Sequence, residues 1–125
     1  MCSSDLFEVS PRLEAITAPG ATHAPVFGCH PTLREESRRF LLCRALSDHL
    51  LSGLPSLVTR GKSEHQQRNR AFAAEFLAPA ESLRRSIRGG VIGDEELGDL
   101  AQEYRVSDLV LRHQIQNHRL ASIAA

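Results

Sequence analysis

The chain has 125 residues, of which 42% are hydrophobic, and its 15 basic and 15 acidic side chains leave no net charge. This length suffices for one small domain with a buried core, and the balanced charge gives no overall attraction to nucleic acids or membrane surfaces. The sequence contains no apolar run of 18 residues and no signal-peptide pattern, so we expect a cytoplasmic protein that does not contact membranes.

The first 31 residues have the weakest helical pattern in the chain. Short apolar stretches at residues 6–9, 13–16 and 25–28 are separated by Pro and Gly, and Pro19 with Gly20 forms a turn signal. This arrangement predicts two or three short strands, including a hairpin at the edge of a small sheet.

We expect the first long helix to begin at Thr32, because Thr32 and Glu35 match the S/T-x-x-E capping box, and to end before Gly53. Its apolar residues cover more than one face, which predicts burial on most sides of the helix. These residues are Leu33, Phe40, Leu41, Leu42, Cys43, Ala45, Leu46, Leu50 and Leu51. Residues 54–62 contain Pro and Gly and are interpreted as an irregular connection.

A second helix is expected to start at the capping box formed by Ser63 and Gln66. It should end at Pro79, where a short third helix could begin. Its apolar contacts are expected from Ala71, Phe72, Ala74 and Leu77. Among them Phe72 is the largest, and we predict that it anchors the helix in the core.

Two further helices are predicted at residues 94–104 and 108–120, and Ser107 is expected to cap the second. Together these elements predict a single α+β domain over residues 1–125. It would contain strands and loops at 1–31, core helices at 32–90 and a C-terminal helical pair at 91–125.

Residues 39–48 read R-F-L-L-C-R-A-L-S-D, and residues 70–79 read R-A-F-A-A-E-F-L-A-P. This pair of segments resembles the core of the ImmA/IrrE family of zinc metallopeptidase-like proteins. In that family the first segment reads roughly R-F-T-L-A-H-E-L-G-H, and the second ends F-A-A-E-L-L-M-P. The resemblance covers residues 26–120 and implies a zincin-like fold with a small sheet before the motif helix. It also implies an incomplete N-terminus, because family members carry more sequence before this helix.

In this alignment the zinc-binding H-E-x-x-H motif of the family falls on residues 44–48. The two His of such a motif lie one helical turn apart and hold the metal, while the Glu acts as general base. Arg44 is a permanent cation, Ala45 cannot accept a proton, and Asp48 alone does not make a metal site. We therefore predict a degenerate site that holds no zinc and performs no metal-dependent proteolysis.

The third zinc ligand of the family is a Glu near the start of the second helix. It falls on Gln66, although Glu64 is close enough to be an alternative. Gln66 and Glu75 are therefore the candidates for a residual site. We expect Arg44 to take the space of the metal and to pair with a carboxylate, either Asp48 or Glu75.

An unconventional metal site would need Asp48, His49 and His65 together with Glu64 or Glu75. Adjacent residues point about 100° apart on a helix, so Asp48 and His49 cannot easily share one ion. We favour the simpler interpretation, in which His49 is a partly buried polar residue and Asp48 pairs with an arginine.

The C-terminal helical pair also has the spacing of a helix-turn-helix motif. Four polar side chains of its last helix are suited to hydrogen bonds with bases: Arg112, Gln114, Asn117 and Arg119. The preceding helix carries acidic residues that would repel phosphates: Asp94, Glu95, Glu96, Asp99 and Glu103. We therefore predict that the last helix is packed, with Val110, Leu111 and Ile115 facing the core.

Three functions are compatible with these observations. The preferred one, implied by the resemblance, is an inactive metallopeptidase-like domain that acts as a regulatory or protein-binding module for a repressor-like partner. The alternatives are a zinc-dependent endopeptidase with unconventional ligands that cuts repressor-like proteins, and a DNA-binding regulator that uses its C-terminal helices.

Overall fold

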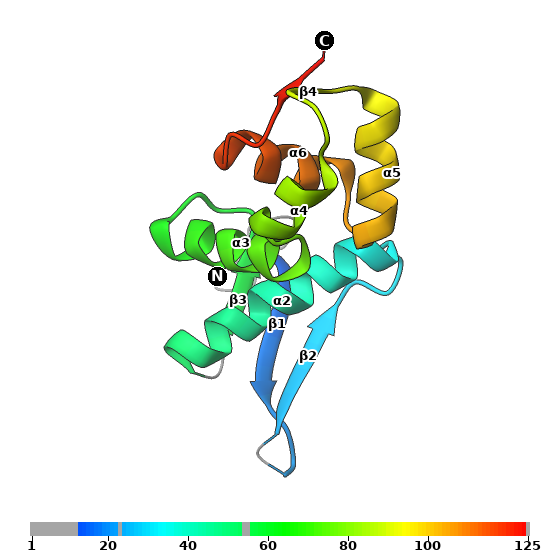
Figure 1. Cartoon of the computed structure of the whole chain (residues 1–125). Helices are drawn as coiled ribbons and strands as arrows, with labels where there is room; N and C mark the ends of the chain where they lie inside the picture. The colour runs from blue at the N-terminus through cyan, green and yellow to red at the C-terminus, as the bar shows by residue number, and fades with distance from the viewer. Residues whose placement is uncertain (1–12, 23, 54–55, 125) are drawn as a thin grey trace. The chain divides into compact units, whose positions relative to one another are not determined.

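The computed structural model describes residues 13–22, 24–53 and 56–124. The chain forms two compact units, Met1–Phe72 and Ala73–Ala125. The described part of the chain contains a three-stranded antiparallel sheet, whose third strand follows the first helix, and five helices (Figure 1), which confirms the predicted α+β class. The apolar stretch at residues 6–9 lies outside the described residues.

The sheet of the first unit has the strand order β2-β1-β3. Its strands are β1 (Leu13–Pro19), β2 (Pro25–Cys29) and β3 (Ser56–Thr59). β1 and β2 form the predicted antiparallel hairpin, in which Pro19 pairs with Pro25 on either side of the turn. The hairpin contributes the central strand and one edge strand of the sheet.

The interpretation of residues 54–62 as an irregular connection is wrong, because β3 lies within this segment and pairs antiparallel with β1. Val58 is fully buried and Leu57 is 54% exposed, which is the alternation expected of a strand with one covered face. A strand of four residues is too short for this alternation of buried and exposed side chains to be recognised in the sequence between the flanking Pro and Gly.

Helix α2 (Glu35–Ser52) packs against this sheet. The predicted capping box at its start is wrong, because the N-cap makes no side-chain bond and Thr32 Oγ1 lies 2.7 Å from His30 Nδ1 in the preceding turn. The predicted end is confirmed. Gly53 has a φ of +80°, which favours glycine, and its N–H donates to the carbonyl of His49.

α2 is buried on two sides, as expected, but one of these sides is polar and a third side is exposed. Leu41 and Ala45 form a small core with Ala15 and Val58 of the sheet. Another side of the helix exposes three leucines by 50%, 38% and 66%: Leu42, Leu46 and Leu50. The remaining side buries polar residues: Arg44, Ser47 and Asp48. The sheet covers only one side of α2, so the count of apolar residues overestimated its apolar burial.

Helix α3 (Glu64–Leu77) begins as the sequence predicts, because Ser63 Oγ accepts the N–H of Gln66 at 3.2 Å. Two of its expected apolar contacts differ from the prediction. Ala71 is exposed, and Phe72 is only partly buried. Phe72 is thus a weaker anchor than its size suggested.

The second unit contains three helices and two short strands. These are α4 (Ala80–Ser86), β4 (Val91–Ile92), α5 (Asp94–Tyr104), α6 (Asp108–Asn117) and β5 (Ser122–Ile123). α5 has the predicted bounds, and α6 ends earlier than the predicted residue 120. β4 and β5 pair in parallel and were not predicted, because two residues give no detectable period.

The core of the second unit is apolar. Its buried members are Ala78, Leu83, Ile87, Ile92, Leu97, Leu100, Ala101, Val106, Leu111 and Ile115. Ser107 Oγ accepts the N–H of Val110 and caps α6 as predicted. Both α5 and α6 are followed by an arginine with positive φ, Arg105 at 56° and Arg119 at 52°, where glycine is the usual residue.

Candidate functional site

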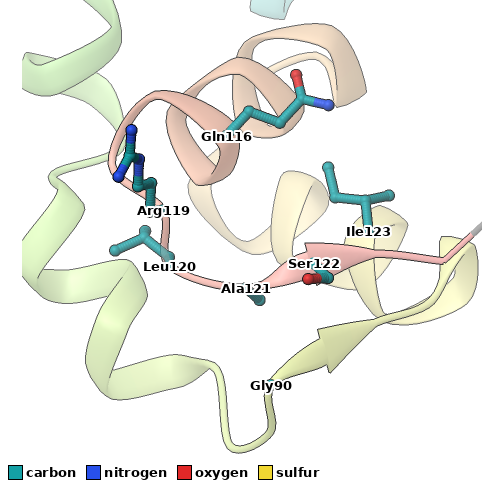
Figure 2. A pocket seen from close by; sticks show the side chains of 7 residues that line it. All are labelled: Gly90, Gln116, Arg119, Leu120, Ala121, Ser122 and Ile123. Carbon is teal, nitrogen blue, oxygen red and sulfur yellow. The ribbon is translucent and has the colours of Figure 1, made fainter.

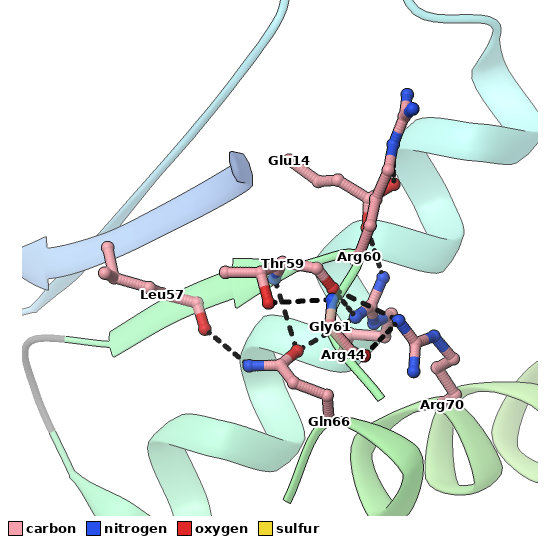
Figure 3. Close-up of polar contacts among 8 residues, drawn as sticks. All are labelled: Glu14, Arg44, Leu57, Thr59, Arg60, Gly61, Gln66 and Arg70. Atoms are coloured by element: carbon pink, nitrogen blue, oxygen red, sulfur yellow. Dashed lines mark hydrogen bonds and ion pairs between the residues drawn. The ribbon is translucent and has the colours of Figure 1, made fainter. Parts of the chain in front are cut away.

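Two residues of the degenerate motif, Arg44 and Asp48, lie on the polar side of α2, which is hydrogen-bonded to α3, whereas Ala45 packs against the sheet. Arg44 is 2% exposed, and its Nη1 donates to Glu14 Oε2 at 2.6 Å. Its Nη2 donates to the carbonyl oxygen of Thr59 at 2.6 Å and to Gln66 Oε1 at 2.9 Å (Figure 3). The guanidinium is therefore held between β1, the end of β3 and the first turn of α3.

The predicted partners of Arg44 are wrong. It pairs with Glu14 rather than with Asp48 or Glu75, because its long side chain reaches the sheet instead of running along its own helix. Burial lowers the pKa of Arg44, while the hydrogen bond and the charge of Glu14 raise it. Since arginine stays protonated in proteins, position 44 holds a permanent buried cation.

The side chain of Gln66 is hydrogen-bonded through both its oxygen and its nitrogen beside Arg44. Its Oε1 also accepts the N–H of Thr59 at 3.2 Å, and its Nε2 donates to the carbonyl oxygen of Leu57 at 3.1 Å (Figure 3). Of the two candidates for the third ligand position, Gln66 contacts Arg44, whereas Glu64 is exposed. A neutral amide used in this way is a poor zinc ligand compared with a carboxylate.

A second buried group surrounds Asp48, which is 2% exposed. Its Oδ1 binds Nε2 of His65 and accepts from Asn69 Nδ2 at 3.3 Å. The Oδ1 of Asn69 in turn accepts from Ser47 Oγ at 2.9 Å. The predicted arginine partner of Asp48 is therefore wrong, because His65 in the first turn of α3 takes that place.

The structure brings together two members of the unconventional metal set, Asp48 and His65. His49 is partly buried, as predicted, and its Nδ1 has no hydrogen-bond partner among the described residues. Within residues 13–22, 24–53 and 56–124, no group of three or more His, Cys, Asp or Glu side chains is placed to hold a metal ion. The contact that the structure shows for this set is the direct one between the side chains of Asp48 and His65.

Glu75 has a structural environment in the second unit. Its two carboxylate oxygens accept the N–H of Ala80 at 3.2 and 3.3 Å, at the start of α4. It also accepts from Gln114 Nε2 at 2.9 Å and lies 3.7 Å from His118 Nε2. The Glu of the F-A-A-E-F-L-A-P segment therefore caps the next helix.

The prediction of a packed last helix is confirmed. Leu111 and Ile115 are fully buried, and Val110 packs against the same core. Gln114, one of the candidate base readers, is 3% exposed and donates to the carbonyl oxygen of Ala78 at 2.8 Å. Arg112 contacts Asp94 at 3.4 Å, while Asn117 and Arg119 are exposed.

Sequence reasoning missed three residues of the polar site: Glu14, Ser47 and Asn69. Ser47 lies in the middle of an apolar helix, and Asn69 follows Gln66 at the i+3 spacing that places both on one side of α3. Polar residues three positions apart on each of two successive helices, Arg44 and Ser47 on the first and Gln66 and Asn69 on the second, could have predicted a polar contact between these helices. Glu14 gave no such signal, because it stands alone within an apolar strand.

The comparisons with known proteins identify no relative. No family model, curated protein or solved structure matches the chain. In the part of the chain that the structure describes, no helix has both the length and the apolar character needed to cross a membrane.

Proposed function

We propose that the chain is an inactive metallopeptidase-like module of the ImmA/IrrE type that regulates a partner protein by binding it. The observation that supports this proposal best is the hydrogen bond between Arg44 and Gln66. These are the residues that the alignment assigns to the first and third zinc ligands, and they lie side by side as ligands of one metal would.

The chemistry of the two side chains argues against retained catalysis. A buried guanidinium repels a divalent cation at short range, and the low local dielectric strengthens this repulsion. Ala45, at the position of the general base, is buried and has no group that accepts a proton. On this proposal, the metal ligands and the general base of the family site are replaced in this chain.

The exposed side of α2 supports a role in protein binding. Leu42, Leu46 and Leu50 are spaced by four residues and form a continuous apolar stripe on the helix surface. Apolar patches of this kind on a folded protein are typical of interaction sites. The resemblance suggests a repressor-like regulator as the partner.

A direct test is to mix the purified chain with a panel of purified helix-turn-helix repressors, with zinc and with a chelator. We expect at least one repressor to bind, with no cleavage in either condition. A Leu42→Ser, Leu46→Ser variant should lose this binding. Leu109→Ser is the matched control, because Leu109 is 61% exposed and lies in the second unit.

Three outcomes would contradict the proposal. Zinc-dependent cleavage of a repressor would favour the peptidase alternative, with Asp48 and His65 as the first residues to mutate. Binding to none of the repressors would remove the proposed partner class. Sequence-selective binding to duplex DNA, lost in Arg112→Ala, would favour the DNA-binding alternative instead.

A further inference from the structure

The second unit has a shallow hollow that none of the contacts above explains. Its volume is about 650 Å³, and it is lined by Gly90, Gln116, Arg119, Leu120, Ala121, Ser122 and Ile123. Gln116 lies in the last turn of α6, residues 119–121 connect α6 to β5, Ser122 and Ile123 form β5, and Gly90 precedes β4. Figure 2 shows Arg119 and Leu120 toward one end and Ile123 toward the other. The lining thus combines apolar side chains with one cation.

Backbone hydrogen bonds fix the position of the residue that carries this cation. The N–H of Leu120 donates to the carbonyl oxygen of Ile115 at 3.0 Å, and that of Arg119 donates to Gln116 at 3.2 Å. This is the Schellman arrangement at a helix C-terminus, and it puts Arg119 at the position with positive φ. Glycine is favoured there on backbone grounds, so the arginine side chain is retained at a conformational cost.

The charge of Arg119 is available to a ligand. Arg119 is exposed, and no carboxylate of a described residue lies at ion-pair distance from its guanidinium group. Arg84 and Arg85 contact Glu81, and Arg112 contacts Asp94. Arg119 is therefore suited to pair with a carboxylate from another molecule.

The strand beside the hollow has an open edge. In the parallel pair, Ser122 donates to Gly90 at 2.8 Å and Ala124 donates to Ile92 at 2.9 Å, so both N–H groups point toward β4. The N–H and C=O of Ile123, between them, must point to the opposite side. An edge of this kind binds extended peptides by adding a strand to the sheet.

We infer that this hollow binds an extended segment of a partner protein that carries an acidic side chain next to apolar residues. The segment pairs with the outer edge of β5, its carboxylate binds Arg119, and its apolar side chains contact Leu120 and Ile123. The hollow lies wholly within the second unit. Peptide binding there therefore does not depend on whether the site around Arg44 in the first unit has lost its zinc.

The experiment uses the whole chain and a fluorescent peptide, acetylated and amidated at its ends, of sequence Glu-Thr-Val-Thr-Val, in which the Glu and both Val side chains lie on one face of a strand. Fluorescence anisotropy should show saturable binding that weakens with added salt. The Gln-Thr-Val-Thr-Val peptide should bind about tenfold more weakly, because it lacks the charge-assisted hydrogen bond. Methylation of alternate backbone nitrogens should also weaken binding, because it removes strand pairing.

Two protein variants complete the test. Arg119→Gln should weaken binding of the Glu peptide about tenfold. Arg105→Gln is the matched control, because Arg105 has the same backbone conformation after α5 and is not among the residues lining the hollow. It should leave the affinity unchanged. Circular dichroism checks that both variants are folded.

Several results would overturn the inference. Absence of binding at millimolar peptide, or equal affinity for the Glu and Gln peptides, would remove the acidic segment as the ligand. Binding only of a Gln peptide with a free C-terminus would assign the site to terminal carboxylates. Equal losses in Arg119→Gln and Arg105→Gln would show that the effect is structural.

Discussion

The two units of the chain bury different kinds of side chain. The small apolar core of the first unit lies beside a buried polar layer of Arg44, Ser47, Asp48, Gln66 and Asn69. The second unit buries ten apolar residues together, and Gln114 is its buried polar residue among those described. Apolar packing specifies the second unit, whereas the first unit depends on hydrogen bonds whose loss leaves buried polar groups unpaired.

The largest expected effect comes from the buried cation of the first unit. Arg44→Ala should lower the free energy of unfolding by about 3–5 kcal/mol, because it removes one partner of a buried charged network. Urea denaturation measures this change. Arg60→Ala is the matched control, since Arg60 approaches the same Glu14 at 3.6 Å but is 72% exposed, and it should cost at most about 1 kcal/mol. Equal effects of the two variants would show that the network is not buried in solution.

The apolar core of the second unit provides the opposite test. Leu111→Ala should cost about 2–5 kcal/mol, because it leaves a cavity among fully buried side chains. Thermal and urea unfolding measure the change. Leu50→Ala should be nearly neutral, since Leu50 is 66% exposed on α2. A large cost for Leu50→Ala would mean that the exposed stripe of α2 is covered in solution, for instance by a second copy.

A smaller effect is expected from the thiol of Cys43 in the first unit. Burial raises its pKa above the ordinary value of 9.0, while the charge of Arg39 opposes this shift. The protonated thiol therefore stabilises the fold below about pH 9, and this contribution is lost as the pH rises further. The slope of unfolding free energy between pH 8 and 10 should be flatter in Cys43→Ala.

Alkylation gives an independent check on Cys43. In a Cys2→Ala background, iodoacetamide at pH 8 should modify the partly buried Cys29 before the buried Cys43. Mass spectrometry after timed quenching measures the two rates. Faster modification of Cys43 would contradict both its burial and its raised pKa.

The difference between the units also explains where sequence-based prediction succeeded. The bounds of α5 and the cap at Ser107 follow from local signals: acidic residues in the first turn, leucines at helical spacing and a serine N-cap. The position of β3 depends on pairing with a strand about 40 residues earlier, which no local signal reports.

The candidate site shows the same limit at the level of side chains. The alignment assigns Arg44 and Gln66 to two ligand positions, and the two side chains are hydrogen-bonded to each other. It did not predict that Glu14 would neutralise Arg44 or that His65 would bind Asp48. These partners are selected by the tertiary arrangement of strand and helix, which sequence spacing alone does not contain.

Zinc content tests the central claim most directly. The purified chain, incubated with excess zinc and dialysed, should contain no stoichiometric metal by elemental analysis, because Arg44 is a buried cation bonded to the neutral amide of Gln66. A variant with Arg44→His, Ala45→Glu, Asp48→His and Gln66→Glu should gain measurable zinc affinity. About one zinc per wild-type chain, lost on Asp48→Ala or His65→Ala, would contradict the account.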